Sequence, residues 1–198
     1  MLTAGIVLML FAVAGAGIVA YTYEETAQRI AENERQTLLR RLNQVVPAEA
    51  YDNAIHEDTI AVSAPELGSE QPLTVYRARK SGEPVAAILT VVAPHGYSGE
   101  IKLLVGVYAS GEAAGVRVVS HQETPGLGDA IEAERSSWIE QFKGKALGAP
   151  PAADWKVAKD GGEFDRITGA TISARAVVDA VKRALQYFAE HRKELFAE

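Results

Sequence analysis

The stretch Asp165-Arg166-Ile167-Thr168-Gly169-Ala170-Thr171-Ile172-Ser173 lies directly before the last long amphipathic segment of the chain. From Ile172 to Leu195, apolar residues recur at three- and four-residue spacing, which predicts a helix with one buried face. Thr168 to Ser173 would then lie at a helix N-terminus, where backbone N–H groups lack intrahelical partners and the peptide dipoles favour negative charge. Gly169 and Ala170 have too little side chain to keep a ligand away. The stretch therefore predicts a helix start that can receive a phosphate.

The hydroxyl groups of Thr168, Thr171 and Ser173 have three possible uses. Each can cap the helix, hydrogen-bond a phosphate or accept a covalent group. Thr or Ser before an apolar-periodic run is also what an ordinary helix N-cap looks like. Residue chemistry alone therefore leaves the cap and the ligand site open.

The pattern Asp165-x-x-Thr168-Gly169-Ala170-Thr171 resembles the motif Asp-x-x-[Ser/Thr]-Gly-Ala-[Ser/Thr] that flavin transferases recognise. A second stretch, Gln122-Glu123-Thr124-Pro125-Gly126-Leu127-Gly128, resembles the loop that accompanies this motif in the G subunit of the Rnf electron-transport complex and in the C subunit of the sodium-pumping NADH:quinone reductase. The run from Gly96-Tyr97-Ser98-Gly99 through His121 to Trp138-Ile139 is closer to the Rnf protein. This likeness extends over nearly the whole chain.

The resemblance implies an FMN joined through its phosphate to the hydroxyl of Thr171, which would be an attachment point and not a catalytic residue. Thr168 and Ser173 would hydrogen-bond the phosphate or cap the helix, beside Gly169 and Ala170. Asp165 would be read by the transferase during attachment. Four residues of the second stretch would border the flavin: Glu123, Thr124, Gly126 and Leu127.

Composition limits the other chemistry that the chain can perform. Its 198 residues carry a net charge of −6 without a Lys/Arg cluster, which argues against nucleic-acid binding. The absence of cysteine excludes disulfides, thiolate nucleophiles and Cys-ligated iron–sulfur clusters. The four histidines show no metal-ligand spacing, so we expect no metal site. Any redox role must use another cofactor.

The N-terminal segment from Met1 to Tyr23 contains no charged side chain. About 20 apolar residues in a helix span the roughly 30 Å hydrocarbon core of a bilayer. A cleaved signal peptide is the alternative, but such peptides begin with a basic region and have a shorter apolar run. We therefore expect a retained transmembrane helix over residues 1–23. A face of small residues, Ala12, Ala16 and Ala20, would permit close helix packing.

The charges near this segment do not fix its orientation. Arg29, Arg35, Arg40 and Arg41 alternate with glutamates, and by the positive-inside rule the arginines alone place the domain in the cytoplasm. The resemblance implies the opposite: a single-pass protein of the bacterial inner membrane whose domain lies on the periplasmic side. We follow the resemblance.

The rest of the chain predicts an α+β domain over residues 48–198, after a connecting helix over residues 24–47 that ends before Pro47. Strands are expected near Asp58 to Val62 and at four further runs, with helices near Ala133 to Phe142 and from Ile172 to Leu195. The four runs are Leu73–Arg79, Pro84–Val92, Ile101–Tyr108 and Gly115–Ser120. Their spacing predicts a mostly antiparallel sheet.

The segment Thr124-Pro125-Gly126-Leu127 fits a tight turn, because Pro presets φ and Gly supplies a positive φ. The preceding His121 is interpreted either as a strand-end histidine bonded to the backbone or as a proton shuttle. Trp138, Ile139 and Phe142 are expected in the core.

The Rnf resemblance implies a membrane complex that moves electrons between ferredoxin and NAD and couples this to ion transport. The resemblance also implies that this chain is the flavin relay of that complex. The chain has no recognisable nicotinamide site, since no Gly-x-Gly-x-x-Gly motif follows a strand. Three alternatives stay open. They are a flavin relay like the C subunit of a sodium-pumping quinone reductase, a stand-alone flavoprotein reductase, and a membrane-anchored assembly or binding module without flavin in which Thr171 caps a helix.

Overall fold

The computed structural model describes residues 2–197, which divide into a unit up to Arg40 and a compact unit from Arg41 onward. Helix α1, Leu2–Val45, is continuous and is long and apolar enough near its start to cross a membrane. The hydroxyl groups of Thr22 and Thr26 donate to the carbonyls four residues earlier, so these polar side chains are satisfied within the helix. The predicted helical N-terminal region is therefore present. The division at residues 23 and 47 stays a prediction.

The compact unit is built on a five-stranded antiparallel sheet in which the strands follow the chain order. Its strands are β1 Thr59–Val62, β2 Leu73–Lys80, β3 Glu83–Ala93, β4 Ile101–Tyr108 and β5 Ala113–Ser120. Each strand pairs with the next, from Ile60 opposite Val75 to Gly106 opposite Gly115. The α+β class and the antiparallel sheet are thus confirmed, with strand ends within about two residues of those expected.

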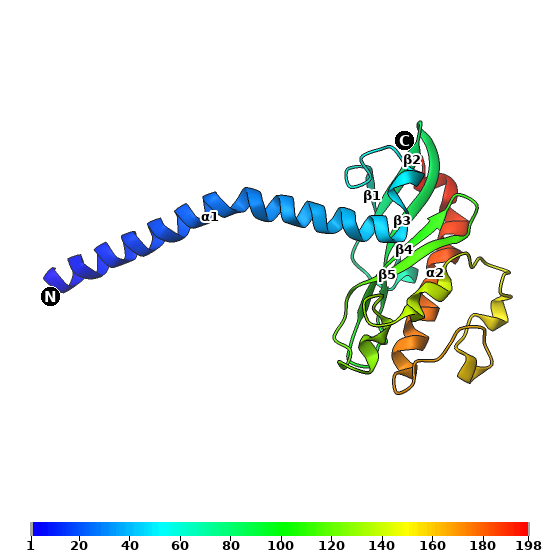
Figure 1. The fold of residues 1–198 in the computed structure, drawn as a ribbon. Helices are drawn as coiled ribbons and strands as arrows, with labels where there is room; N and C mark the ends of the chain where they lie inside the picture. The colour runs from blue at the N-terminus through cyan, green and yellow to red at the C-terminus, as the bar shows by residue number, and fades with distance from the viewer. Residues whose placement is uncertain (1, 198) are drawn as a thin grey trace. The chain divides into compact units, whose positions relative to one another are not determined.

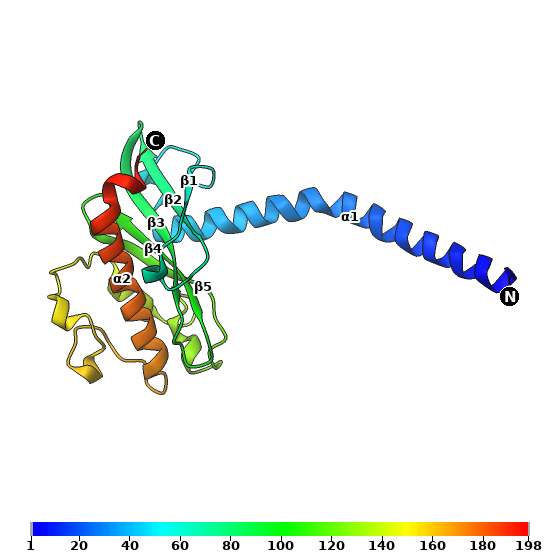
Figure 2. The same cartoon turned by 180° about the vertical axis from the view of Figure 1, so that it is seen from behind.

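Helix α2, Thr171–Leu195, covers one face of this sheet (Figure 1 and, from behind, Figure 2). Its buried face includes Val177, Val181, Leu185 and Phe188, as the apolar spacing predicts. These side chains share a core with alternate residues of β3 and β4, among them Leu89, Leu103 and Val105. Burial of this amphipathic face, rather than helix propensity, holds α2 in place.

The opposite face of the sheet is covered by the last turn of α1 and the segment after it. Leu42, Val45 and Val46 are fully or almost fully buried. A Cβ at Gly106 would lie 2.4 Å from Cγ1 of Val45, and one at Gly115 would lie 2.9 Å from the Val45 carbonyl oxygen. Because these two glycines are cross-strand partners, they make a flat patch on which the helix end packs.

Residues between β5 and α2 form short 3-10 helices where the sequence predicts a helix near Ala133 to Phe142. The segment Ser137–Phe142 (η4) is a 3-10 helix, and a second one, Gly128–Ile131 (η3), precedes it. The predicted helix is therefore present but starts four residues later than expected. Trp138, Ile139 and Phe142 are nevertheless in the core, as predicted, and Phe142 stacks on Phe164 with 4.8 Å between ring centroids. Further 3-10 turns are η1 Ala48–Ala50, η2 Pro65–Leu67, η5 Ala152–Asp154 and η6 Ala158–Asp160.

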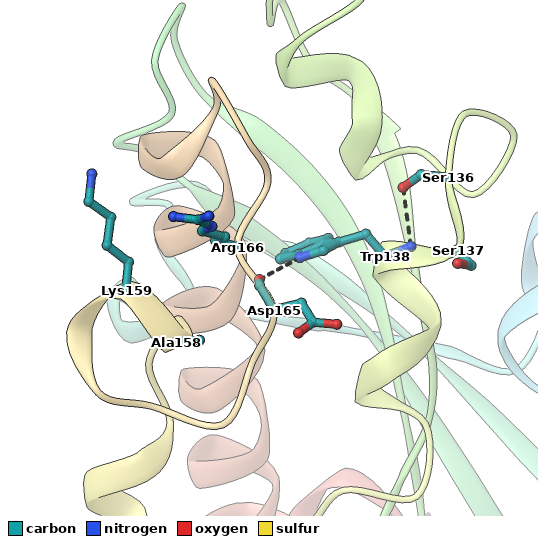
Figure 3. Close-up of a pocket in the computed structure, with 7 residues that line it drawn as sticks. All are labelled: Ser136, Ser137, Trp138, Ala158, Lys159, Asp165 and Arg166. Carbon is teal, nitrogen blue, oxygen red and sulfur yellow. Dashed lines mark hydrogen bonds between the residues drawn. The ribbon is translucent and has the colours of Figure 1, made fainter.

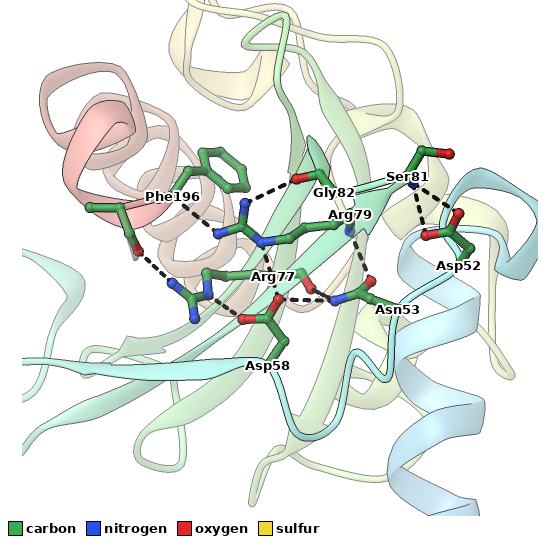
Figure 4. A network of polar contacts seen from close by, with 9 residues as sticks. Asp52, Asn53, Asp58, Arg77, Arg79, Ser81, Gly82 and Phe196 are labelled. Atoms are coloured by element: carbon green, nitrogen blue, oxygen red, sulfur yellow. Dashed lines mark hydrogen bonds and ion pairs between the residues drawn. The ribbon is translucent and has the colours of Figure 1, made fainter.

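Two arginines of β2 fasten the segment after α2 to the sheet (Figure 4). Arg77 donates to the Ala197 carbonyl at 2.8 Å and Arg79 donates to the Phe196 carbonyl at 3.0 Å. Both guanidinium groups also pair with Asp58, whose side chain is about one-fifth exposed. This polar cluster fixes the C-terminal end of α2, far along the helix from Thr171.

Candidate functional site

A pocket of about 580 Å³ lies where the N-terminal end of α2 meets the loop after β5. Two segments separated by more than forty residues line it together: Glu123 to Gly128 and Gly169 to Ser173. Seven of the nine predicted binding residues line this pocket, namely Glu123, Thr124, Leu127, Gly169, Ala170, Thr171 and Ser173. Gly126 and Thr168 do not line it, and both are exposed. The fold thus brings together the two stretches that the sequence singles out.

Helix α2 begins at Thr171 with Ala170 in the N-cap position and without a side-chain cap. The interpretation of Thr171 as a helix cap is therefore wrong, because Thr171 is the first helical residue. Its side chain is partly exposed at the pocket. The Ala174 N–H donates to the Ala170 carbonyl and the Ala170 N–H donates to the Ile167 carbonyl, so the N–H groups available to a ligand are those of the first turn, from Thr171 to Ser173.

The loop before this helix approaches the other wall of the pocket closely. Gly169 has a φ of +84°, which an L side chain rarely adopts. A Cβ there would lie 2.9 Å from Cδ2 of Leu127. Glycine at this position therefore allows both the turn into α2 and the contact with the opposite wall.

The expected tight turn forms that opposite wall. The Leu127 N–H donates to the Thr124 carbonyl at 3.1 Å, and Gly126 has a φ of +78°. Leu127 projects outward with 48% of its surface exposed. Gly126 thus serves the backbone of the turn, while Leu127 offers an apolar edge to the pocket.

Glu123 connects three segments beneath the pocket. Its side chain is buried, and its two carboxylate oxygens accept hydrogen bonds from the Ser98 N–H at 3.0 Å and from the Ser173 hydroxyl at 2.5 Å. A buried carboxylate requires such donors. Ser173 is itself fully buried and donates to Glu123, so its hydroxyl does not cap the helix. Glu123 and Ser173 fix the floor of the pocket from within.

His121 lies just after β5 and is bonded to the backbone, as one of its two interpretations predicts. Its Nδ1 accepts the Glu123 N–H at 2.9 Å, so its Nε2 carries the proton and donates to Glu132 at 2.9 Å. His121 does not line the pocket. The Nδ1 bond holds the backbone of Glu123, and the Nε2 bond connects His121 to Glu132.

Lys159 is the only cationic side chain among the residues that line this pocket. It lies in η6, next to Asp160, and the sequence did not indicate it. Asp160 receives two hydrogen bonds from Arg175 of α2, at 2.5 and 2.6 Å. The hydrogen bond from Arg175 lowers the pKa of Asp160, and the same bond raises the pKa of Arg175. This pair fastens η6 to the first turns of α2.

A second pocket, of about 540 Å³, lies beside the first (Figure 3). Lys159 lines both pockets, whereas Asp165 and Arg166 line the second. The backbone of Asp165 is held on both sides, since its N–H donates to Gln141 and its carbonyl accepts the Trp138 indole N–H, both at 2.7 Å. The Asp165 side chain is exposed. Asp165 and Thr171 therefore present their side chains to different pockets.

Three pocket residues besides Lys159 were missed by sequence reasoning: Tyr97, Gly128 and Ile172. Tyr97 and Ile172 are 68% and 46% exposed. Gly128 is buried, and a Cβ there would lie 2.9 Å from the Glu123 carboxylate. The Gly96-Tyr97-Ser98-Gly99 stretch had matched the family, but it carried no chemistry that could assign Tyr97 to the site.

Comparisons with known proteins agree with this geometry. Residues 96–186 match the FMN-binding domain, and residues 1–45 match the RnfG N-terminal region. The G subunit of the ion-translocating oxidoreductase complex of Vibrio cholerae strain O395 is 46% identical over 191 residues, which cover 96% of this chain and 91% of that protein. The chain belongs to the family of G subunits of ion-translocating oxidoreductase complexes.

Other members of this G-subunit family are similarly close. The Pseudomonas aeruginosa UCBPP-PA14 protein is 48% identical over 198 residues, covering all of this chain and 92% of the relative. The Shewanella baltica OS223 protein is 44% identical over the same length, covering 93% of the relative. The likeness therefore includes the apolar helix, the sheet and both walls of the pocket.

The pocket residues fit an FMN. The volume lies within the range of cofactor pockets, which runs from about 300 to 1,000 Å³. The uncapped start of α2 provides N–H donors and a favourable dipole for a phosphate. Three exposed apolar side chains, Tyr97, Leu127 and Ile172, offer contacts to a ring system.

Proposed function

We propose that this protein is the flavin relay of a membrane-bound ion-translocating oxidoreductase complex and carries FMN attached through its phosphate to the hydroxyl of Thr171. The observation that supports this most strongly is the position of Thr171. It is the first residue of an uncapped helix, is partly exposed, and lines the pocket of a matched FMN-binding domain.

The residues of the pocket have separate roles in this proposal. The free N–H groups at the start of α2 bind the phosphate, because Gly169 and Ala170 leave the backbone accessible. Tyr97, Leu127 and Ile172 contact the isoalloxazine, while Thr124 and Gly126 shape the turn beside it. Ser173 and Glu123 support the floor. When bound, the flavin supplies the electron chemistry, and the protein supplies position and electrostatics.

Asp165 acts in attachment rather than in the flavin pocket. Its exposed side chain faces the neighbouring pocket, and its backbone is fixed by Gln141 and Trp138. A rigid, accessible carboxylate at this place is suited to recognition by a flavin transferase. Thr168 is also exposed and lies in the turn that precedes the proposed acceptor, Thr171.

The relatives and the apolar helix support a place in a membrane complex with other subunits. We propose that residues 1–23 cross the bacterial inner membrane once, that residues 24–47 connect them to the FMN-binding domain, and that this domain lies on the periplasmic side. In that complex the flavin would relay electrons between the ferredoxin side and the NAD side. The relatives favour this Rnf-type role over the quinone-reductase alternative, since both ends of the chain match the G-subunit family.

Attachment is tested by expressing the full chain with a flavin transferase and recording flavin fluorescence on a denaturing gel. We expect a fluorescent wild-type band and a dark Thr171→Ala band. A dark wild-type band, when the transferase labels a control protein, would reject covalent attachment and favour a module without flavin.

A further inference from the structure

We propose that Lys159 is the charge-compensating residue of the flavin site and that its ammonium group pairs with the phosphodiester at Thr171. This inference rests on the proposed function, because it requires a flavin at Thr171. Of the residues that line the pocket, Lys159 and Glu123 carry a formal charge. Glu123 is negative, buried and already occupied by Ser98 and Ser173. Lys159 is thus the side chain that can neutralise a cofactor anion.

The side chain of Lys159 is available for such a pairing. It is exposed, and within residues 2–197 its ammonium group forms no hydrogen bond or ion pair within 4 Å; it acts on the Asp160 carboxylate only through Coulombic attraction. The carboxylate of its neighbour Asp160 is engaged by Arg175 instead. In Figure 3 the side chain of Lys159 extends away from the Trp138 indole. Lys159 lines both pockets.

The backbone that carries Lys159 is fixed relative to the start of α2. The bidentate pair between Asp160 and Arg175 joins η6 to the helix whose first residue is Thr171. The Gly162 N–H donates to the Val157 carbonyl, and the Phe164 N–H donates to the Lys156 carbonyl. These two bonds close the loop that contains η6. A phosphodiester carries one permanent negative charge. A lysine whose backbone is fixed near that charge loses less conformational entropy on pairing than a freely moving surface lysine, so the free energy of pairing is more favourable.

A thermodynamic cycle separates this pairing from a general structural role. The full chain is produced with and without the flavin transferase, and the labelled and unlabelled proteins are melted separately. Lys159→Met should change the melting temperature of the unlabelled protein little, since the exposed side chain acts there only on Asp160, through an exposed Coulombic attraction that Lys156 shares. It should lower the melting temperature of the labelled protein. The difference between the two effects is the coupling between Lys159 and the flavin.

Matched variants make the test specific. Lys156→Met removes a charge from the same loop, but Lys156 is exposed and lines neither pocket, so it should show no coupling. Lys159→Arg should keep the coupling, and high salt should reduce it. Equal effects of Lys159→Met with and without flavin would overturn the inference and leave attachment at Thr171 intact. If the wild-type protein carries no covalent flavin, the proposed function and this inference both fail.

Discussion

The hydroxyl of Ser173 donates a hydrogen bond of 2.5 Å to the carboxylate of Glu123, fifty residues earlier in the chain. This bond joins the first turn of α2 to the loop after β5, and both groups are buried. The other carboxylate oxygen of Glu123 accepts a hydrogen bond from the Ser98 N–H. This bond connects the loop after β3 to the same junction. The walls of the pocket at Thr171 are therefore held together from below by the buried Glu123–Ser173 pair.

Removal of the Glu123 carboxylate should loosen this junction. Glu123→Ala leaves the Ser173 hydroxyl buried without its acceptor, and an unsatisfied buried polar group costs about 1–3 kcal/mol. We expect a fall of that size in the free energy of unfolding, measured with urea, together with reduced flavin labelling. Glu123→Gln keeps a side-chain acceptor for Ser173, so its unfolding free energy should fall less than that of Glu123→Ala. The exposed Glu100→Ala is the control, and an equal effect of both alanine variants would contradict the assigned role.

Gly128 should be intolerant of a side chain for a steric reason. A Cβ there would lie 2.8 Å from the Glu123 Cβ and 3.3 Å from the Ser173 hydroxyl oxygen. Overpacking of this kind costs about 1–3 kcal/mol, so Gly128→Ala should lower both stability and labelling.

Gly126→Ala provides the comparison for Gly128. Gly126 has a φ of +78° but open space around its Cβ position, so alanine there strains the turn by about 1–2 kcal/mol without entering the pocket floor. Labelling should be reduced by Gly128→Ala and largely kept by Gly126→Ala. Wild-type labelling of the Gly128 variant would refute this account.

The Asp160–Arg175 pair should depend on pH. The hydrogen bond from Arg175 lowers the pKa of Asp160 in the folded protein, so the pair stabilises the attachment of η6 above the unfolded-state pKa. That stabilisation is lost as the pH falls through the lowered folded-state pKa. Arg175→Gln should raise the pKa of Asp160 toward its ordinary value. The measurement is an NMR titration of the Asp160 carboxyl carbon. An unchanged titration would show that the pair does not form in solution.

Asp58 should be needed to fasten the end of α2. It pairs with Arg77 and Arg79, which in turn bind the carbonyls of Ala197 and Phe196 (Figure 4). These side chains are mostly buried, so Asp58→Ala should cost about 2 kcal/mol of unfolding free energy. Flavin labelling should persist, because the pocket lies at the other end of the helix. Glu70→Ala, at an exposed site, is the control; if it destabilises as much, the cluster has no special role.

The elements of this domain were predictable where the residue pattern has a clear period. Strands β2 to β5 and helix α2 follow alternating, continuous or three-to-four spacing, and each forms within about two residues of its expected range. The segment near Ala133 to Phe142 was predicted as a helix of about ten residues, without a type. It forms a 3-10 turn, since a six-residue segment is governed by tertiary packing of Trp138 and Phe142 more than by periodicity.

The pocket was predictable only in part. The two stretches carried motif-like residues, so Thr171 and the turn at Gly126 could be named from the sequence. Tyr97 and Lys159 could not, because their positions depend on how loops distant in the chain meet around α2. The hydrogen bond from Ser173 to Glu123 could not be predicted either, because the two residues are fifty positions apart and meet only in the folded domain.

The most direct test of the account is the site of flavin attachment. Trypsin cleaves after Arg166 and Arg175, and the peptide from residue 167 to 175 contains Thr168, Thr171 and Ser173 together. Tandem mass spectrometry of this peptide, from full-length protein produced with a flavin transferase, should locate the mass of FMN less one water on Thr171. Thr171→Ser should keep that mass, because the motif accepts either hydroxyl residue at this position, and Thr171→Val should lose it. An unmodified peptide, or a flavin on Thr168 or Ser173, would contradict the proposal.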